Sequence, residues 1–506
     1  MNDVVNSTDR KSRVLMLGVD AMSLPFARAH LDQLPALRSL LKDGVLIAPE
    51  TSGGQFSGSP WPTFAYGKDV GEHGIYFPFQ WDAKHLKQRR QRDAVWREQF
   101  ALEPFWFELA RAGIACTVLD AGCILNSEAA PCRQITNWSY QETSWSESSD
   151  ADLLAEICQR FGRRPMGKDV PVPKNEALCN EIRDQLIEAV ERKSDAILWL
   201  MNRHEWQFFL AGFYEVHRAG HILWPSTGEF ASKASPDAML EIYKAQDRQL
   251  QRIIEHALDE RTTLVLFALH GMGPNAAQDH FLPRLMSKLN ARYLSELGIL
   301  DAPAKGLSFV SLLRKAVPYK LQTVLAELLG ESVQDWVANR SIIGGYDWAR
   351  TPAFALSTEG VGYLRLNIKG REAQGFFEAG SKDLDDYVAW LEDELLSIRV
   401  VGTGEPLVKS LLQTRDVFKG PRSHLLPDIL LKWAPVAPVE NIVSNKIGQI
   451  HERLRTGRGG NHIGESFVVV AGQCASKNSV REIAHIKDIG RFARSCFVPS
   501  MAREPA

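Results

Sequence analysis

Short apolar runs alternate along this chain with longer segments of helical periodicity, and this alternation constrains the fold more than any other feature. A polar or glycine-containing stretch ends each run, and in the segments between, such as 239–257, apolar residues recur at a spacing near 3.6. Continuous apolar strands separated by helices are typical of a mostly parallel sheet that helices cover on both faces. The sequence therefore predicts an α/β fold. The predicted buried strands are Val14–Gly18, Ala115–Leu119, Phe208–Phe213 and Leu264–Ala268.

The second half of the chain is more mixed. Residues 281–340 are rich in helical patterns, so we expect an inserted helical cap there, and short strands return after it. The predicted organisation is one α/β domain over residues 12–475 that contains this cap, with terminal extensions at 1–11 and 476–506.

Charge and cysteine content narrow the partners and compartments that we expect. The formal net charge is −2, from 59 basic and 61 acidic side chains, so nothing favours nucleic acid or an anionic membrane as the main partner. The first apolar run, Val14 to Val19, is too short for a signal peptide, and no stretch approaches the roughly 18 apolar residues that a membrane span needs. Seven scattered cysteines without CxxC pairs suggest reduced thiols and a cytoplasmic protein. The oligomeric state is not indicated.

Polar stretches lie beside these runs, where parallel sheets bind ligands. Asp20 ends the first run, although a lone aspartate there is most often a turn or helix-cap residue. Residues 51–77 contain SGGQFSGSPWP, a permissive turn into a helix. A hydroxyl in such a turn suits a nucleophile or an anion site, and it suits an ordinary serine cap equally well.

Histidines mark three further stretches. His217 and His221 in YEVHRAGH are one helical turn apart, a common spacing of metal ligands, although an isolated HxxxH pair is more often ordinary surface pairing. His270 follows the run in VLFALHGMG, and His462 precedes another run in GGNHIGESF. All five stretches occurring beside strands by chance is much less expected than any one of them occurring there alone.

The order and wording of these stretches resemble the type I phosphodiesterase and nucleotide pyrophosphatase branch of the alkaline phosphatase superfamily. That branch has an Asp after its first strand, a Ser or Thr before a proline-rich turn ending in TG, then DxxGH, DHGM and a late His. The matching stretches here are WPTFAYG, GEHGIYF, RAGHILW, HGMGPN, YLRLNIKGRE and LPDILLKW, and the resemblance covers roughly residues 12 to 475. It implies an alkaline phosphatase-like fold and an enzyme that acts on phosphoric esters.

Position by position, the resemblance places Ser57 where the family keeps its nucleophilic hydroxyl, six residues before Thr63. It places His221, His270 and His462 on metal-binding histidines, and Asp20 on a metal-binding carboxylate.

Two departures change the expected metal site. His217 stands where the family has the Asp of DxxGH, and Leu269 stands where it has the Asp of DHGM. Two divalent ions would then face one clear carboxylate, and burying that charge imbalance is costly. Three neutral imidazoles with an open fourth position make a credible zinc site. We therefore expect one zinc ion per chain on His217, His221 and His462, with a weak or empty site at Asp20, Ser57 and His270.

Three functions stay open at this stage. The first is a metal-dependent phosphohydrolase or phosphodiesterase of a small phosphate- or sulfate-like ester, with Ser57 as nucleophile. The second is a cytoplasmic biosynthetic transferase that moves a phosphoryl, sulfuryl or sulfamoyl group to an alcohol, and the third is a ligand-binding pseudoenzyme. Glu215, the one carboxylate near the altered ligands, is expected to orient His217 or His221.

Overall fold

The protein is described by a computed structural model. The described residues are 12–91, 96, 100, 102–122, 124, 127–140, 145–167, 172, 175–225, 233–299, 339, 346–454 and 457–497.

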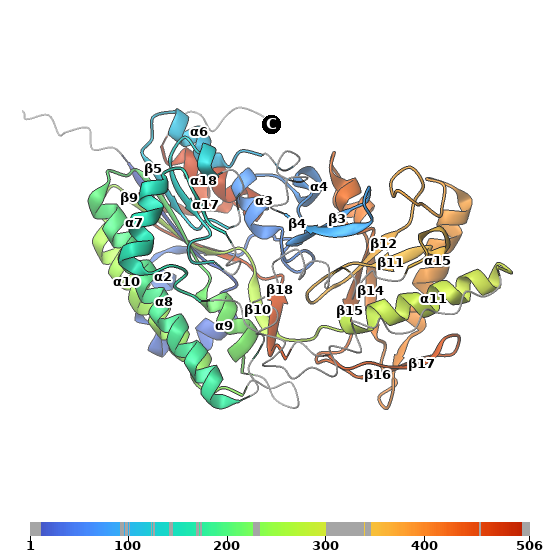
Figure 1. Cartoon of the computed structure of the whole chain (residues 1–506). Helices are drawn as coiled ribbons and strands as arrows, with labels where there is room; N and C mark the ends of the chain where they lie inside the picture. The colour runs from blue at the N-terminus through green and yellow to red at the C-terminus, as the bar shows by residue number, and fades with distance from the viewer. Residues whose placement is uncertain are drawn as a thin grey trace, which may run out of the picture.

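An eight-stranded sheet forms the centre of the larger half of the molecule (Figure 1). The strand order is β2-β19-β9-β1-β8-β5-β6-β7, and the pairs β9-β1, β1-β8, β8-β5 and β5-β6 are parallel. The central strands β1, β8 and β9 are almost wholly buried, as their continuous apolar sequences require. The predicted mostly parallel α/β fold is confirmed. The strands are β1 (Arg13–Val19), β2 (Val45–Ile47), β5 (Cys116–Leu119), β6 (Arg133–Thr136), β7 (Glu147–Ser148), β8 (Phe208–Phe213), β9 (Thr262–Ala268) and β19 (Phe467–Gly472).

Two groups of helices flank this sheet. In the first group, helices pack side by side along α8, whose N-cap Asn175 accepts a hydrogen bond from the Leu178 N–H at 2.9 Å. In the second group, α3 and α6 pack with the C-terminal helix α18. The first group is α2 (Pro35–Asp43), α7 (Ala151–Phe161), α8 (Glu176–Arg203), α9 (Glu215–Leu223) and α10 (Ala238–Ala257); the second includes α3 (Pro60–Tyr66), α6 (Phe105–Arg111) and α18 (Ile489–Ser495).

The C-terminal segment belongs to this body. The sequence predicts residues 476–506 as an extension, but Val480, Ile486 and Phe492 are buried in the same core as the central sheet. The domain therefore continues past residue 475, at least to residue 497. Residues 1–11 and 498–506 lie outside the described part.

The smaller half of the molecule has its own sheet and its own hydrophobic core, the second core (Figure 1). Its sheet has the order β11-β12-β15-β14, and helices α11 (Leu282–Glu296) and α15 (Lys382–Ser397) contribute to the core. The predicted cap begins in α11, which packs on β11, and the rest of the cap, residues 300–338 and 340, lies outside the described part. The strands are β11 (Ala353–Ala355), β12 (Gly362–Leu366), β14 (Val408–Gln413) and β15 (Ile429–Trp433), with a smaller sheet of β13 (Arg399–Val400), β16 (Asn441–Ser444) and β17 (Gly448–His451).

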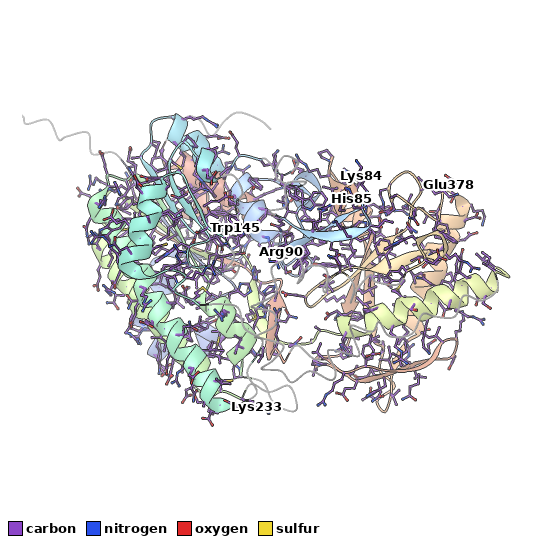
Figure 2. All side chains as sticks on the ribbon, viewed as in Figure 1. Lys84, His85, Arg90, Trp145, Lys233 and Glu378 are labelled. Carbon is purple, nitrogen blue, oxygen red and sulfur yellow. The ribbon has the colours of Figure 1, made fainter. Side chains whose placement is uncertain are left out.

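Two short ribbons lie between the halves. The first pairs β3 (Phe79–Asp82) with β4 (Lys87–Arg90), and Lys84 and His85 lie at its turn (Figure 2). The second pairs β10 (Gly271–Pro274) with β18 (Gly460–Ile463) directly after β9 of the central sheet. Among the helices described here, none is both long and apolar enough to cross a bilayer.

Candidate metal centre and active site

Three neighbouring strands of the central sheet deliver the first site residues. β8, β1 and β9 are adjacent and parallel, with Gly18 beside both Gly212 and Phe267. Their carboxyl ends therefore meet at one edge, where Asp20 follows β1 and His270 follows β9. Both side chains are buried, at 3% and 2% exposure.

The remaining histidines come from a helix and from a ribbon. Helix α9 starts after β8 and places His217 and His221 one turn apart on the face that looks into the site. His462 lies on β18, whose pairing with Met272 of β10 brings it back beside the end of β9. Residues more than two hundred positions apart in the sequence thus converge.

The three histidines His217, His221 and His462 approach one another through their Nε2 atoms. The His217 Nε2 lies 3.0 Å from the His221 Nε2 and 2.6 Å from the His462 Nε2. Ligands about 2.0–2.1 Å from a tetrahedral zinc ion lie about 3.3 Å from one another, close to this spacing. We call His217, His221 and His462 the histidine centre; its three nitrogens leave one side of such an ion open.

The other ring nitrogens show which tautomers are present. The His221 Nδ1 lies 3.1 Å from the Gly460 carbonyl oxygen, and the His217 Nδ1 contacts a carboxylate oxygen of Asp20. Since both partners only accept hydrogen bonds, each Nδ1 carries a proton, and each Nε2 of a neutral ring presents a lone pair. When His217 and His221 are both neutral, their Nε2 lone pairs face each other at 3.0 Å and repel, and a cation between them removes the repulsion, so these residues fit a bound metal ion.

Burial favours the neutral form of two of these histidines, His221 and His462. Desolvation, helped by the Arg458 charge and by His217, holds the pKa of His221 well below its ordinary value. Desolvation and the neighbouring histidines do the same to the pKa of His462. Neutral imidazole is the form that binds a metal.

Asp20 holds the histidine centre in place from one side. Its carboxylate contacts the His217 Nδ1 and accepts a hydrogen bond from the Trp61 Nε1 at 2.9 Å, and the His270 Nε2 lies 3.3 Å away. Burial alone raises the pKa of the Asp20 carboxyl, but the charges and hydrogen bonds of His217 and His270 outweigh it and lower that pKa far below its usual range. An ionised carboxylate behind a metal-binding histidine fixes the ring and increases its basicity.

Glu215 lies elsewhere, which corrects the role expected for it. Its carboxylate accepts hydrogen bonds from the Tyr214 N–H at 2.9 Å and the Ser139 hydroxyl at 3.3 Å, and it bonds to neither His217 nor His221. Burial raises its pKa. Asp20 orients His217, and a backbone carbonyl orients His221.

The turn with Ser57 lies against the same edge of the sheet. At its start, a Cβ on Gly53 would lie 2.4 Å from the His270 Cβ, so only glycine permits this approach. At its end, Trp61 bonds to Asp20. Ser57 lies between these two points, and no contact between Ser57 and the histidine centre appears among the described residues.

The hydroxyls of this turn differ in their partners. Ser52 and Ser59 bond to each other at 2.6 Å, and Thr51 donates to the Leu269 carbonyl oxygen at 2.6 Å. The Ser57 Oγ is buried and has no hydrogen-bond partner within the described ranges. A buried hydroxyl without a partner costs about 1–3 kcal/mol, and such groups in native proteins often have a functional explanation.

Comparison with known proteins identifies the family of this chain. The family model described as type I phosphodiesterase / nucleotide pyrophosphatase matches residues 14–339, which contain Asp20, Ser57, His217, His221 and His270. The chain belongs to this family. It is therefore an enzyme of a metal-dependent, phosphoester-hydrolysing family, as the sequence predicts.

Solved structures support the fold of this phosphodiesterase family member. Phosphonoacetate hydrolase from Sinorhizobium meliloti 1021, in complex with phosphonoformate, is 14% identical with a TM-score of 0.52, over 97% of this chain and 96% of that chain. Wild-type alkaline phosphatase PafA is 13% identical with a TM-score of 0.55, over the same shares of the two chains. Both show an alkaline phosphatase-like fold across nearly the whole chain. No curated protein matches the sequence itself at a significant level.

The two departures from the family pattern have different surroundings. His217 takes part in the histidine centre, whereas Leu269 is 1% exposed and packs in the core of the central sheet. Asp20, His217 and His270 also lie close enough together to hold an ion. However, the Asp20 carboxylate already contacts the rings of His217 and His270. Leu269 supplies no further ligand.

Two functional neighbours were missed from the sequence. Trp61 anchors Asp20, and its place in the SPWP turn gave no sign of that contact. Arg458, 28% exposed and paired with Glu359 at 2.8 Å, is close enough to lower the pKa values of His221 and His462. Its position four residues before His462 was the available signal.

Proposed function

We propose that this chain is a metal-dependent phosphohydrolase or phosphodiesterase that acts on a small phosphate ester through a serine nucleophile. The observation that carries the proposal is the convergence on the His217 Nε2 of the His221 Nε2, at 3.0 Å, and the His462 Nε2, at 2.6 Å. Family membership supports the reaction class.

One zinc ion per chain is part of the proposal. The donor set of the histidine centre, three neutral imidazoles, suits zinc, and Leu269 argues against a second tightly held ion. A divalent ion held there would supply positive charge to a phosphoryl oxygen as negative charge develops on it.

The protein's own residues have distinct parts in this mechanism. Ser57 is the nucleophile, supported by its free hydroxyl and by the pairing of Ser52 with Ser59. Asp20 keeps His217 in the tautomer that presents Nε2, and His270 is its second partner at the same edge. Arg458 adds a positive charge that favours an anionic substrate.

A transferase would differ only in whether water or an alcohol takes up the transferred group.

The six described cysteines are free thiols, which supports the cytoplasmic location expected for either version.

The test combines elemental analysis of the purified protein with turnover of bis(p-nitrophenyl) phosphate and p-nitrophenyl phosphate, each with and without an added alcohol. We expect about one zinc ion per chain and hydrolysis that a chelator abolishes and zinc restores. Release of p-nitrophenol only with alcohol present, together with an alkyl phosphate product, would replace hydrolysis by transfer. Metal-free protein with full turnover would contradict the mechanism.

A further inference from the structure

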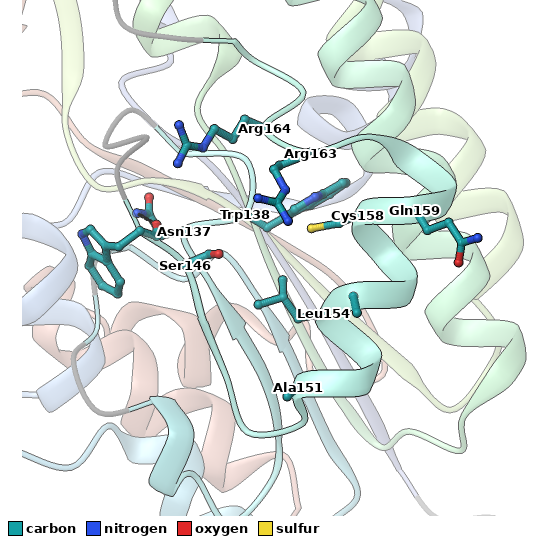
Figure 3. Close-up of a pocket in the computed structure, with 11 residues that line it drawn as sticks. Asn137, Trp138, Ser146, Ala151, Leu154, Cys158, Gln159, Arg163 and Arg164 are labelled. Carbon is teal, nitrogen blue, oxygen red and sulfur yellow. Dashed lines mark hydrogen bonds between the residues drawn. The ribbon is translucent and has the colours of Figure 1, made fainter. Parts of the chain in front are cut away.

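A pocket of about 620 Å³ opens beside the strands β6 and β7, and the proposed function does not use it (Figure 3). Residues after β6 and before β7 form one wall, helix α7 forms the second, and the loop after α7 forms the rim. This volume lies within the usual range of small-molecule sites. The lining residues are Asn137, Trp138, Trp145, Ser146, Ala151, Leu154, Ala155, Cys158, Gln159, Arg163 and Arg164.

Helix α7 presents a second apolar stripe to this pocket. Leu153 and Ile157 are buried in the main core, as expected for an amphipathic helix. Ala151, Leu154, Ala155 and Cys158 recur at helical spacing on another side and line the pocket, and Leu154 and Cys158 also pack in part against the main core. The helix thus gives the pocket an apolar floor.

Polar groups on the opposite wall lack partners. The Asn137 side chain is 3% exposed; its amide nitrogen donates to the Trp145 carbonyl oxygen, and its Oδ1 is buried and unbonded in the described part of the chain. The Trp145 Nε1 is likewise buried without a described partner, whereas the Trp138 Nε1 donates to the Gly162 carbonyl oxygen at 3.0 Å. One buried acceptor and one buried donor without described partners therefore belong to residues that line the pocket.

The rim carries positive charge without compensation. Arg163 and Arg164 form no ion pair or side-chain hydrogen bond with any residue that the structure describes, and no acidic side chain lines the pocket. Figure 3 shows the Arg163 side chain turned toward Trp138 and Cys158. Arg164 and Asn137 both have a left-handed backbone, with φ of 59° and 65°, a conformation that arginine adopts rarely.

We propose that this pocket is a second ligand site that binds an organic phosphate with a flat apolar part. The flat part would pack between Trp138, Trp145 and the α7 floor, and the phosphate would pair with Arg163 and Arg164. A small inorganic anion would leave the apolar floor exposed, and a neutral ring would leave both guanidinium groups unpaired.

The pocket is separate from the histidine centre. β6 is three strands away from β1 in the sheet order, about 14 Å at the usual strand spacing. The two sites can therefore be altered independently, and the inference does not depend on the metal chemistry.

The test is calorimetric titration of the full-length protein with benzylphosphonate, which has no ester bond to hydrolyse. The same titration is made with His221→Ala, with Arg163→Ala/Arg164→Ala, and with Ala155→Trp, which fills the pocket from an exposed position. Arg160→Ala is the matched control, because Arg160 is an exposed arginine of α7 that pairs with Glu156 outside the pocket.

We expect binding to persist in His221→Ala and Arg160→Ala, to weaken roughly tenfold or more in the double arginine variant, and to disappear in Ala155→Trp. Benzyl alcohol and inorganic phosphate should each bind at least roughly tenfold more weakly than benzylphosphonate. Binding that only His221→Ala abolishes would assign the ligand to the histidine centre and overturn the proposal. Equally tight binding of inorganic phosphate would overturn the part played by the apolar floor.

Discussion

Two largely buried polar clusters of this protein differ in how completely their hydrogen-bonding groups and charges are paired. In the smaller half, Arg365 and Arg371 face Glu372 and Asp428, with Arg371 bound to both Asp428 oxygens at 2.6 and 2.7 Å. We call these four residues the ion-pair network. In the larger half, the histidine centre directs three Nε2 atoms at one another.

The difference separates a structural role from a functional one. The ion-pair network has equal numbers of positive and negative groups, and the Leu366 N–H and the Leu426 carbonyl oxygen take up further hydrogen bonds. Such a cluster needs nothing from outside. The histidine centre has no negative group of its own and could hold a cation between its rings, and the Ser57 hydroxyl, without a partner among the described residues, lies in the adjoining turn. Polar groups without hydrogen-bond partners distinguish the site from the ion-pair network; burial and charge do not.

The largest effect should come from the free hydroxyl. Ser57→Ala should lower kcat by about a thousandfold or more, because no other group of the turn can take over as nucleophile. Steady-state kinetics on the preferred ester measures this, and the melting temperature should not fall, because the variant removes a buried hydroxyl that has no described partner. Ser59→Ala is the control: it removes a bonded hydroxyl and should cost about 1 kcal/mol of stability with kcat changed by less than about threefold. Near-normal turnover by Ser57→Ala would exclude the serine mechanism.

Next comes the loss of metal from the histidine centre. His217→Ala, His221→Ala and His462→Ala should each lower zinc occupancy from about one per chain to a small fraction, since two imidazoles hold zinc far more weakly than three. Elemental analysis measures occupancy, and the zinc-dependent rise in melting temperature should vanish with it. His256→Ala, an exposed histidine of α10, should change neither. Two tightly held ions in the unaltered protein would contradict a single centre.

A substitution in the ion-pair network should lower stability and leave zinc occupancy and kcat unchanged. Arg371→Ala leaves Asp428 and Glu372 with too little positive charge, and should lower the free energy of unfolding by about 3–5 kcal/mol. Denaturant unfolding measures the loss, while zinc occupancy and kcat at low temperature should remain as in the unaltered protein. If zinc content fell in proportion to stability, the two clusters would not be independent.

The smallest and most informative effect concerns Leu269. Leu269→Asp adds an unpaired carboxylate at a position with 1% exposure, so we expect native turnover to fall by about tenfold. Metal stoichiometry and turnover of native and generic esters are compared. A second bound ion with a gain in both activities would mean that the chain is an impaired member of its family, and not one adapted to a single ion.

Much of this was decided by local sequence. The apolar runs predicted β1, β5, β8 and β9 within two residues, because a parallel strand buried on both faces needs a continuous apolar segment. The site histidines could also be found in advance, since the carboxyl ends of such strands form one edge.

Tertiary structure alone decided which contacts those residues make. The direction in which α9 leaves β8 determines that Asp20, and not Glu215, supports His217. This direction cannot be predicted from the spacing of residues in the sequence. The hydroxyl left without a partner was likewise undecided among Ser52, Ser57 and Ser59, because their pairing depends on how the turn folds back on itself. The pocket beside α7 depends on where the residues around β6 and β7 lie against that helix, and the sequence shows the apolar side of the helix but not this arrangement. Residue identity and periodicity in the sequence determine which side chains can be buried. Only the contacts of the folded protein determine which buried polar groups remain without a hydrogen-bond partner.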